Sequence, residues 1–392
     1  MEILSPRVYF EEKSSGLNPI AGAGTSTVLF VGLVKEASAS LKVTKITNYS
    51  EFVSEYGGGD EAKLYGTVHN TECYLPYAVK HFFAEGGTVC YVLNLNDGAK
   101  KTFAQAKDLI LANEQITILC YPEGAADATF AANVVEVCTK INAFAIIDAV
   151  AAADHTDDEI DLATFSAVGS LYDKMLAVYY PWVKVVDATD ATQTVDIPPS
   201  CVVAGVYART DGERGVHKAP AGISGGICRS VVGVTNPASE IEHDKFVERS
   251  TNKEGIKVNF IRPVVGVGTC IWGARTWYPS GAASGERYVN VCRLEAFLKD
   301  SLRDGLMWVT FKPNTPELWG QVNRSVTAFM RRLWQEGALF GSKEEEAFQV
   351  IVDKTNNAET MALGELHITL KYAPVKPAEF VVLTFTQKTS QG

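Results

Sequence analysis

Between residues 72 and about 211, short apolar runs alternate with segments whose apolar residues recur every three or four positions. Such short runs are typical of strands buried on both faces; they lie at residues 89–93, 116–120, 144–147 and 177–180. The segments with helical spacing lie at residues 75–83, 103–110, 134–141 and 165–172. Because strands and helices alternate, the pattern predicts a parallel sheet covered by helices, a doubly wound α/β domain.

A glycine-rich stretch, residues 212–285, separates this region from a part of the chain with a different pattern. There we predict two helices and three strands, namely helices at residues 291–302 and 316–335 and strands at residues 307–311, 348–352 and 365–372. In the last strand, apolar residues alternate strictly with polar ones, so one face is buried and the other is wet. These apolar residues are Leu366, Ile368, Leu370 and Tyr372. The mixture predicts an α+β domain.

Each end of the chain carries a strand-like run without a local partner. Residues 7–12 follow Pro6, and residues 380–386 follow Pro374 and Pro377, which bar a tight hairpin. Such a strand either packs on its own domain or adds to the edge of a sheet in another molecule. An exposed apolar strand invites aggregation, unless polymerisation is its purpose. The residues are Val8, Tyr9, Phe10, Glu11 and Glu12 at one end, and Phe380, Val381, Val382, Leu383, Thr384 and Phe385 at the other.

The charge of the chain limits its partners. The 392 residues carry a formal charge of −10, which argues against nucleic acid because phosphate binding needs a basic face. Residues 281–392 are neutral, with 13 Lys and Arg against 13 Asp and Glu, so the acidity lies in the middle of the chain. No apolar run reaches the roughly 18 residues of a membrane helix. The opening residues lack a basic leader and an apolar run, so we expect no signal peptide and folding in the bacterial cytoplasm.

The eight cysteines are widely spread and mostly have apolar neighbours. No two of them have the C-x-x-C spacing of a zinc or redox motif. We therefore expect buried, reduced thiols.

Three short motifs invite a catalytic or metal-binding interpretation. Residues 222–226 (GISGG) match the nucleophile-elbow pattern around Ser224, but the residues before them read as a loop and not as the required strand. Residues 22–27 (GAGTST) lack the lysine of a phosphate loop. The spacing of His69, Cys73 and His81 fits no common metal site. We therefore predict no enzyme activity, cofactor or metal, with a serine hydrolase using Ser224 as an alternative.

The predicted helix at residues 316–335 has two distinct faces. One is an apolar stripe at alternating spacings of three and four, made of Trp319, Val322, Val326, Phe329 and Leu333. On the opposite side Arg324 and Arg331 stand two turns apart, and Arg332 follows. These arginines form either a solvated face or a basic stripe that docks on an acidic partner.

Several longer segments form an ordered series over most of the chain. Residues 5–12 (SPRVYFEE) are similar to Pro-Gly-Val-Tyr-Val-Glu-Glu, with Arg7 in place of the glycine. The other segments are residues 20–26 (IAGAGTS), 30–32 (FVG), 46–57 (ITNYSEFVSEYG), 198–200 (PPS), 203–211 (VAGVYARTD), 214–221 (RGVHKAPA), 272–276 (WGART), 288–291 (YVNV), 314–319 (NTPELW) and 377–381 (PAEFV). Together they resemble the tail sheath proteins of contractile phages and of related contractile injection systems. The resemblance is weakest between residues 60 and 195, and the family usually has tryptophan where His217 stands.

The resemblance implies a mechanism. In such sheaths, subunits stack as six-membered rings around an inner tube, and the terminal strands of each subunit join a sheet in its neighbours. The extended sheath is metastable and shortens without nucleotide, which drives the tube through a target envelope. The implied partners are further copies of the chain, with or without sheath paralogues, the inner tube protein, and the baseplate and terminator or cap proteins. Nucleic acid and membrane insertion are not expected.

We therefore predict a structural subunit with two domains. Residues 1–20 and 281–392, including the linking strand 380–386, form an α+β assembly domain that contains the receiving sheet around Leu366 to Tyr372. Residues 21–280 form an outer α/β domain that the resemblance makes subtilisin-like in outline, without the catalytic residues. It also places Arg324, Arg331 and Arg332 on the helix that contacts the inner tube. The particle is a virion tail or a released tail-like particle; a non-contractile self-assembling tube protein is a further alternative.

Overall fold

The computed structural model describes residues 18–151, 166–168, 171, 173–237, 258–278, 287–357 and 364–378. The chain divides into two compact units. The smaller unit spans residues 1–23 and 298–374, and the larger spans residues 24–297 and 375–392. The boundary between residues 297 and 298 differs from the one predicted near residue 281. It falls within helix α8 (Val289–Gly305), a continuous helix whose sequence marks no break.

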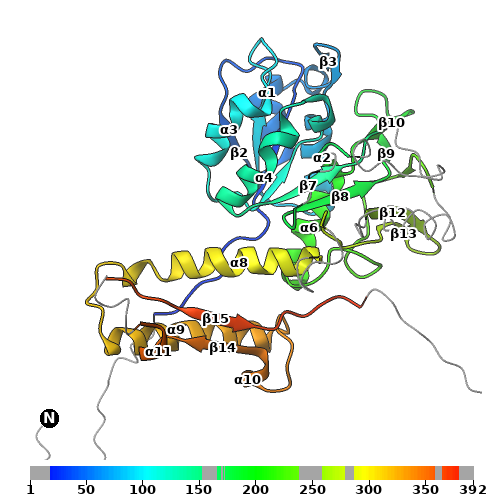
Figure 1. The fold of residues 1–392 in the computed structure, drawn as a ribbon. Helices are drawn as coiled ribbons and strands as arrows, with labels where there is room; N and C mark the ends of the chain where they lie inside the picture. Colours follow the sequence, from blue (N-terminus) through cyan, green and yellow to red (C-terminus); the bar gives the residue numbers. More distant parts are fainter. Residues whose placement is uncertain are drawn as a thin grey trace, which may run out of the picture. The chain divides into compact units, whose positions relative to one another are not determined.

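The larger unit is built on an eight-stranded sheet with the order β13-β12-β8-β7-β6-β1-β5-β2 (Figure 1). The neighbours from β12 to β5 run parallel, and the edge strands β13 and β2 are antiparallel to theirs. The strands are β1 (Val28–Gly32), β2 (Val43–Ile46), β5 (Cys90–Asn94), β6 (Ile118–Cys120), β7 (Phe144–Asp148), β8 (Leu176–Tyr180), β12 (Asn259–Val264) and β13 (Gly268–Ile271). All four strands predicted from the apolar runs therefore belong to one mainly parallel sheet.

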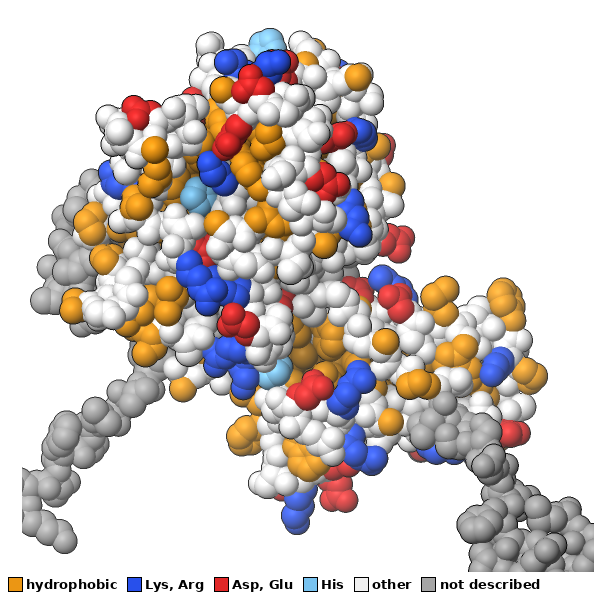
Figure 2. Space-filling view, turned by 180° about the vertical axis from the view of Figure 1, so that it is seen from behind, with side chains coloured by type: hydrophobic (Ala, Val, Ile, Leu, Met, Phe, Trp, Pro, Cys, Tyr) orange, Lys and Arg blue, Asp and Glu red, His pale blue; other side chains and the backbone are white. Residues whose placement is uncertain are grey.

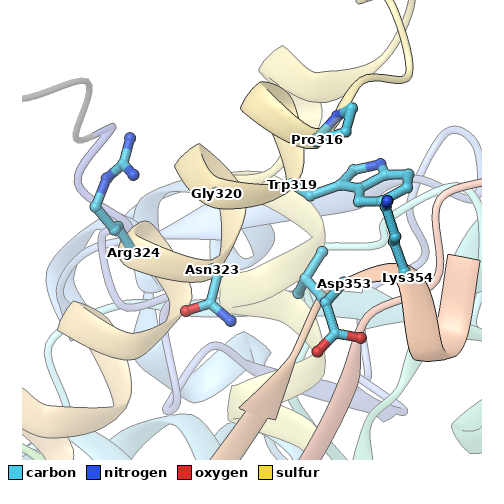
Figure 3. A pocket seen from close by; sticks show the side chains of 8 residues that line it. Pro316, Trp319, Gly320, Asn323, Arg324, Asp353 and Lys354 are labelled. Carbon is cyan, nitrogen blue, oxygen red and sulfur yellow. The ribbon is translucent and has the colours of Figure 1, made fainter.

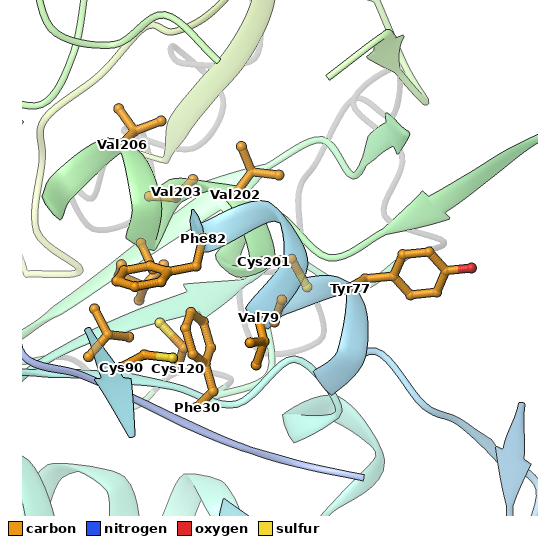
Figure 4. Packing of buried hydrophobic residues seen from close by; sticks show 14 of the residues in the cluster. Phe30, Tyr77, Val79, Phe82, Cys90, Cys120, Cys201, Val202, Val203 and Val206 are labelled. Carbon is orange, nitrogen blue, oxygen red and sulfur yellow. The ribbon is translucent and has the colours of Figure 1, made fainter. Parts of the chain in front are cut away.

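Helices cover both faces of this sheet. Helices α1 (Tyr49–Gly57), α2 (Leu75–Glu85) and α6 (Ser200–Arg214) pack on one face, and α3 (Phe103–Leu111) and α4 (Phe130–Ile141) on the other. The strands supply both cores by alternation: in β1, Phe30 belongs to the first core and Leu29 to the second. Figure 4 shows Phe30 packed beneath Phe82 of α2 in the first core. This arrangement confirms the predicted parallel sheet between helical layers.

Smaller elements extend the larger unit. Strands β3 (Thr67–Val68) and β4 (Thr71–Glu72) form a short hairpin, and β9 (Val183–Val186), β10 (Thr194–Ile197) and β11 (Gly233–Val234) form a three-stranded sheet. Two 3-10 helices, Glu61–Lys63 and Gly124–Ala126, lie in connections. Of the helix predicted at residues 165–172, Phe165 and Tyr172 lie outside the described residues. Ser166 forms a bridge with Ala149 and is followed by a turn.

The smaller unit packs a long helix against a two-stranded sheet (Figure 1). After the end of α8 its elements are a 3-10 helix (Met307–Val309), α9 (Pro316–Gln335), α10 (Glu344–Ala347), β14 (Phe348–Ile351), α11 (Lys354–Asn357) and β15 (Thr369–Tyr372). Helix α9 has the bounds that the sequence predicted. Its start is fixed locally, because Thr315 accepts a hydrogen bond from the Leu318 amide and Pro316 occupies the first turn.

The prediction of a strand at residues 307–311 is wrong. Met307–Val309 is a 3-10 helix, continued by hydrogen bonds from the Thr310 amide to the Met307 carbonyl and from the Lys312 amide to the Val309 carbonyl. Phe311, between Thr310 and Lys312, has a φ of 68° and a fully exposed side chain. The amides of Val309, Thr310 and Lys312 are bound within the turn and are not available to a sheet ladder.

The strand predicted at residues 365–372 is shorter, because β15 covers Thr369–Tyr372 alone. The main chain of His367 is bound by the side chain of Asn357, which accepts from the His367 amide at 2.6 Å and donates to its carbonyl at 3.0 Å. This amide pair replaces the ladder that would have extended the strand.

Candidate assembly site

Helix α9 and the two-stranded sheet form the core of the smaller unit. The apolar stripe of α9 is buried, with exposures between 0% for Val322 and 5% for Leu333. Strands β14 and β15 are antiparallel, with Phe348 opposite Tyr372 and Val350 opposite Leu370. In the part of the chain that the structure describes, no third strand pairs with either one. The outer edge of β14 is partly used, because the Val350 carbonyl accepts from Asn323 of α9 at 3.3 Å; an added strand could pair along the rest of the sheet's edges.

The predicted receiving residues keep the alternation that the sequence shows. Leu366, Ile368, Leu370 and Tyr372 are half-buried, whereas Thr369 and Lys371 between them are exposed. An apolar face that is half covered, on a sheet of only two strands within the described residues, fits the addition of further strands. The linking strands themselves, residues 7–12 and 380–386, lie outside the described residues.

The three predicted tube-contacting arginines are exposed but differ in their partners. Arg331 binds Glu344 through two nitrogens, at 2.7 and 2.9 Å. Arg332 donates to the carbonyl of Ile20 at 3.2 Å. Arg324 has no ion pair within the described ranges. A partner could therefore bind Arg324 without displacing an existing ion pair.

Arg324 lines an open cavity of about 410 Å³ at the start of α9 (Figure 3). Pro316 and Trp319 contribute apolar surface, and Asn323 and Lys354 contribute polar groups. Figure 3 shows Trp319 of α9 beside Asp353 and Lys354 of the turn after β14, with the Arg324 side chain pointing away from them. The cavity therefore combines aromatic surface with two cationic side chains and the carboxyl group of Asp353.

In the larger unit, the position where ligands usually bind in open α/β sheets is filled by a carboxyl group. Such sites lie at the carboxyl ends of the strands where the strand order reverses, here between β1 and β6. The Glu123 carboxyl accepts from the amides of Tyr74 at 2.6 Å and Leu75 at 3.1 Å, at the start of α2. A Cβ atom on Gly32, at the end of β1, would lie 2.5 Å from Glu123 Oε2. Glu123 thus caps a helix and fills the space beside the end of β1.

A second carboxyl group has the same role at the next strand. Asp148, at the end of β7, accepts from the Ser200 amide and from the Ser200 hydroxyl, both at 2.6 Å. It therefore caps α6. Burial raises the pKa of both carboxyl groups, of Glu123 and of Asp148, to about 7. Neither cap was predictable from the sequence, because the carboxyls lie 48 and 52 residues from the helix starts that they bind.

The catalytic and metal motifs do not assemble a site. Ser224 lies in a turn, and its hydroxyl accepts from Arg214 at 3.0 Å. A nucleophile elbow would need a strand directly before it. Residues 22–27 precede strand β1, whereas a phosphate loop follows a strand and opens a helix.

The proposed metal ligands are equally separate. His69 lies in the turn between β3 and β4, and His81 lies in α2. Burial lowers the pKa of His81 to about 4. Over the ranges that the structure describes, no group of three His, Cys, Asp or Glu residues could hold a metal ion. All eight cysteines are free and buried, as predicted; Figure 4 shows Cys90, Cys120 and Cys201 in the first core.

The long signature at residues 203–211 has a structural explanation. It forms most of α6, and its two charged residues are buried in ion pairs. Arg209 pairs with Glu85 of α2 at 2.6 Å, and Asp211 pairs with Arg293 of α8 at 2.5 Å. The signature therefore holds helices together, and sequence reasoning missed both partners because they lie far away in the chain.

Two further features are the distribution of surface charge and the hydropathy of the helices. Figure 2 shows Lys and Arg side chains interspersed with Asp and Glu side chains on the face seen there. None of the described helices is long and apolar enough to cross a membrane.

The phage tail sheath C-terminal domain model matches residues 286–388. A prophage protein of Pseudomonas aeruginosa (strain UCBPP-PA14), assigned as a major tail sheath protein, is 27% identical over 271 residues, which cover 68% of this chain and 64% of the relative. The tail sheath protein of Escherichia phage P2 is 25% identical over 248 residues, 63% of this chain and 57% of the relative. The chain thus spans less than two thirds of these curated relatives.

Solved structures extend the similarity to nearly the whole chain. The contracted sheath complex of the PVC extracellular contractile injection system is 27% identical, with a TM-score of 0.75 and coverage of 99% of both chains. The contracted helical sheath of the anti-feeding prophage is 28% identical, with a TM-score of 0.75 and coverage of 98% of this chain and 100% of that one. In sequence and fold, the chain is similar to contractile tail sheath proteins over nearly its whole length.

Proposed function

We propose that this chain is the structural subunit of a contractile tail sheath, which polymerises as stacked six-membered rings around an inner tube and shortens to drive the tube through a target envelope. The observation that carries the proposal is the similarity to contracted sheath structures over 98–99% of the chain. A likeness of this extent covers both units, and not just the region of the C-terminal family model.

The linkage between subunits uses the two-stranded sheet of the smaller unit. Residues 7–12 and 380–386 of neighbouring copies add to the edges of β14 and β15, and Leu366, Ile368, Leu370 and Tyr372 pack against them. The half-buried state of these four residues supports this role, since an added strand would complete their burial.

The remaining partners follow from the family. The inner tube lies against α9, where Arg324 has neither an ion pair nor the main-chain bond that Arg332 makes within the described residues; the baseplate and a terminator or cap protein bind the ends of the sheath. The α/β unit is subtilisin-like in outline and has no enzymatic role. The internal use of the strand-end carboxyls Glu123 and Asp148 for helix capping supports a structural role.

Deletion of residues 1–12 tests the linkage. We expect folded subunits that form no long tubes in negative-stain electron microscopy, because one of the two linking strands is gone. Deletion of residues 1–4 is the matched control, since it leaves the predicted strand intact, and it should assemble normally. Long tubes from the larger deletion would sink the linkage.

Two measurements separate the alternatives. A serine hydrolase would be labelled by a fluorophosphonate probe, and the label would disappear in Ser224→Ala; we expect no label in either protein. Tubes of a non-contractile protein with the same number of subunits would all have the same length. A contractile sheath would show two lengths for the same number of subunits, one extended and one shortened.

A further inference from the structure

A short segment near the N-terminus is held between the helices of the smaller unit. This segment, residues 18–23, is called the strap here. The Asn18 amide donates to Ser325 Oγ of α9 at 3.2 Å, and the Ala23 amide donates to Ser301 Oγ of α8 at 2.9 Å. Ser325 and Ser301 are 1% and 0% exposed. Two buried helix hydroxyls therefore bind main-chain amides at the two ends of the strap.

The middle of the strap is held by packing and by one further bond. Ile20 is 3% exposed, and its carbonyl accepts from Arg332 at 3.2 Å. A Cβ atom on Gly305, the last residue of α8, would lie 2.5 Å from Ile20 Cγ2 and 2.9 Å from Cγ1. Any other residue at position 305 would collide with Ile20, so glycine is needed there for close approach.

The position of the strap in the chain gives these contacts a mechanical meaning. The strap directly follows residues 1–17, which contain the predicted linking strand. If the strap came loose, six residues would add up to about 20 Å of slack to the connection. A link with that slack would no longer transmit the rotation of one subunit to its neighbour.

We propose that the strap is the anchor through which a pull on the N-terminal segment reaches α8 and α9, with Ser301, Ser325 and Gly305 as its positioning residues. This proposal rests on the proposed function. It separates two properties, since the linking strand makes the connection and the strap keeps the connection short.

The experiment is a size swap at the contact between Gly305 and Ile20. Gly305→Ala introduces the colliding Cβ, and Gly305→Ala with Ile20→Ala removes its two nearest neighbours, Cγ2 and Cγ1 of Ile20, and leaves the Cβ of residue 20 at 3.1 Å. Gly212→Ala in α6 is the matched control, because a Cβ there has no atom within 4 Å. Ser301→Ala with Ser325→Ala removes the two acceptors by a separate route. Hydrogen exchange of a peptide covering residues 18–24 reports the strap in the purified subunit, and electron microscopy reports sheaths before and after contraction.

We expect Gly305→Ala and the double serine variant to speed exchange of the strap peptide by about tenfold or more, with α9 peptides unchanged. Their sheaths should assemble but break into pieces on contraction. The Gly212→Ala protein should match the wild type, and the size swap should restore both slow exchange and unbroken contraction. A rescue of this kind would not follow from a general loss of stability, because the swap removes apolar contacts rather than adding them.

Two results would overturn the anchor. One is unchanged exchange of the strap peptide in both Gly305→Ala and the double serine variant. The other is a released strap in sheaths that still contract unbroken. If the wild-type chain formed no sheath, the proposed function would fail on that result alone, while exchange in the subunit would still decide whether the strap is held by these residues.

Discussion

Arg209 and Glu85 form an ion pair in the interior of the larger unit, with Arg209 Nη1 at 2.6 Å from Glu85 Oε2 and exposures of 7% and 0%. The other carboxylate oxygen accepts from the amide and the hydroxyl of Ser230, at 2.7 and 2.8 Å. Arg209 also donates to the carbonyl of Ile227. The pair thus joins α2, α6 and the segment around residues 227–230, with every charged group satisfied.

Removing one partner of this pair should cost much stability. In Arg209→Leu the Glu85 carboxylate stays buried without its cation, so the free energy of unfolding should fall by about 3–5 kcal/mol. Denaturant unfolding of the purified subunit measures this. Arg229→Ala is the control, because Arg229 and Glu213 are 3.8 Å apart and more than half exposed; its change should stay below about 1 kcal/mol. Equal losses in the two variants would contradict the buried pair as a source of stability.

The capping carboxyls should make stability depend on pH. The pKa of Asp148 is raised by burial to about 7 in the folded chain, against about 3.9 when unfolded. Between these values the folded state holds a proton that the unfolded state has released, so the free energy of unfolding falls as the pH rises. Asp148→Asn keeps an acceptor for the Ser200 amide and lacks this titration.

We therefore expect the stability of Asp148→Asn, relative to wild type, to rise by on the order of 3 kcal/mol between about pH 5 and 8. The pKa of His81 is lowered to about 4, so that residue opposes the trend below about pH 6.5 in both proteins and cancels in the comparison. Thermal or denaturant unfolding across this range gives the difference. A constant gap between the two proteins would show that Asp148 is ionised in the fold.

The receiving sheet gives a prediction about polymerisation. Leu370 is half-buried on β15, and Thr369 beside it is exposed on the opposite face. Leu370→Asp should block tube formation, since an added strand would bury the new carboxylate without a partner. Thr369→Asp makes a similar change on the wet face and should assemble. Circular dichroism of both subunits checks that the fold survives, and tubes from a folded Leu370→Asp protein would argue against this face as the receiver.

Local signals in the sequence predicted some elements well and others badly. Helix α9 was predictable because its cap at Thr315, its first-turn Pro316 and its apolar stripe all lie within the segment. The apolar run at residues 307–311 suits a strand or a tight turn equally, and the packing of Lys312 over Trp308 at 4.4 Å accompanies the turn. Apolar character alone could not choose between these two.

The contacts between distant segments were out of reach of the sequence. The sequence around Gly305 is consistent with a helix end. It does not show that Ile20 packs against this glycine, because Ile20 lies in a distant segment of the chain. In the same way, Glu123 reads as one more acidic residue until the fold brings the start of α2 to it. Family resemblance pointed to α6, but the buried pairs of Arg209 and Asp211 became visible only in three dimensions.

The contact with the inner tube is best tested at Arg324. Arg331→Glu would break the bond to Glu344 and place two carboxylates together, so its effect would mix folding with assembly. Arg324→Glu avoids this, and Lys63→Glu on the larger unit is a control with the same charge change on an exposed side chain. We expect Arg324→Glu to lower the yield of extended sheaths around tubes. Each copy contributes only about 0.2–1 kcal/mol, but every subunit in the sheath repeats the contact.

The loss of extended sheaths in Arg324→Glu should be smaller with a tube of lower surface charge or at a higher subunit concentration. The difference in yield between the wild type and Arg324→Glu should also fall with added salt, because salt screens exposed charges over about 10 Å at 0.1 M. Normal extended particles from Arg324→Glu at low salt would place the tube contact elsewhere.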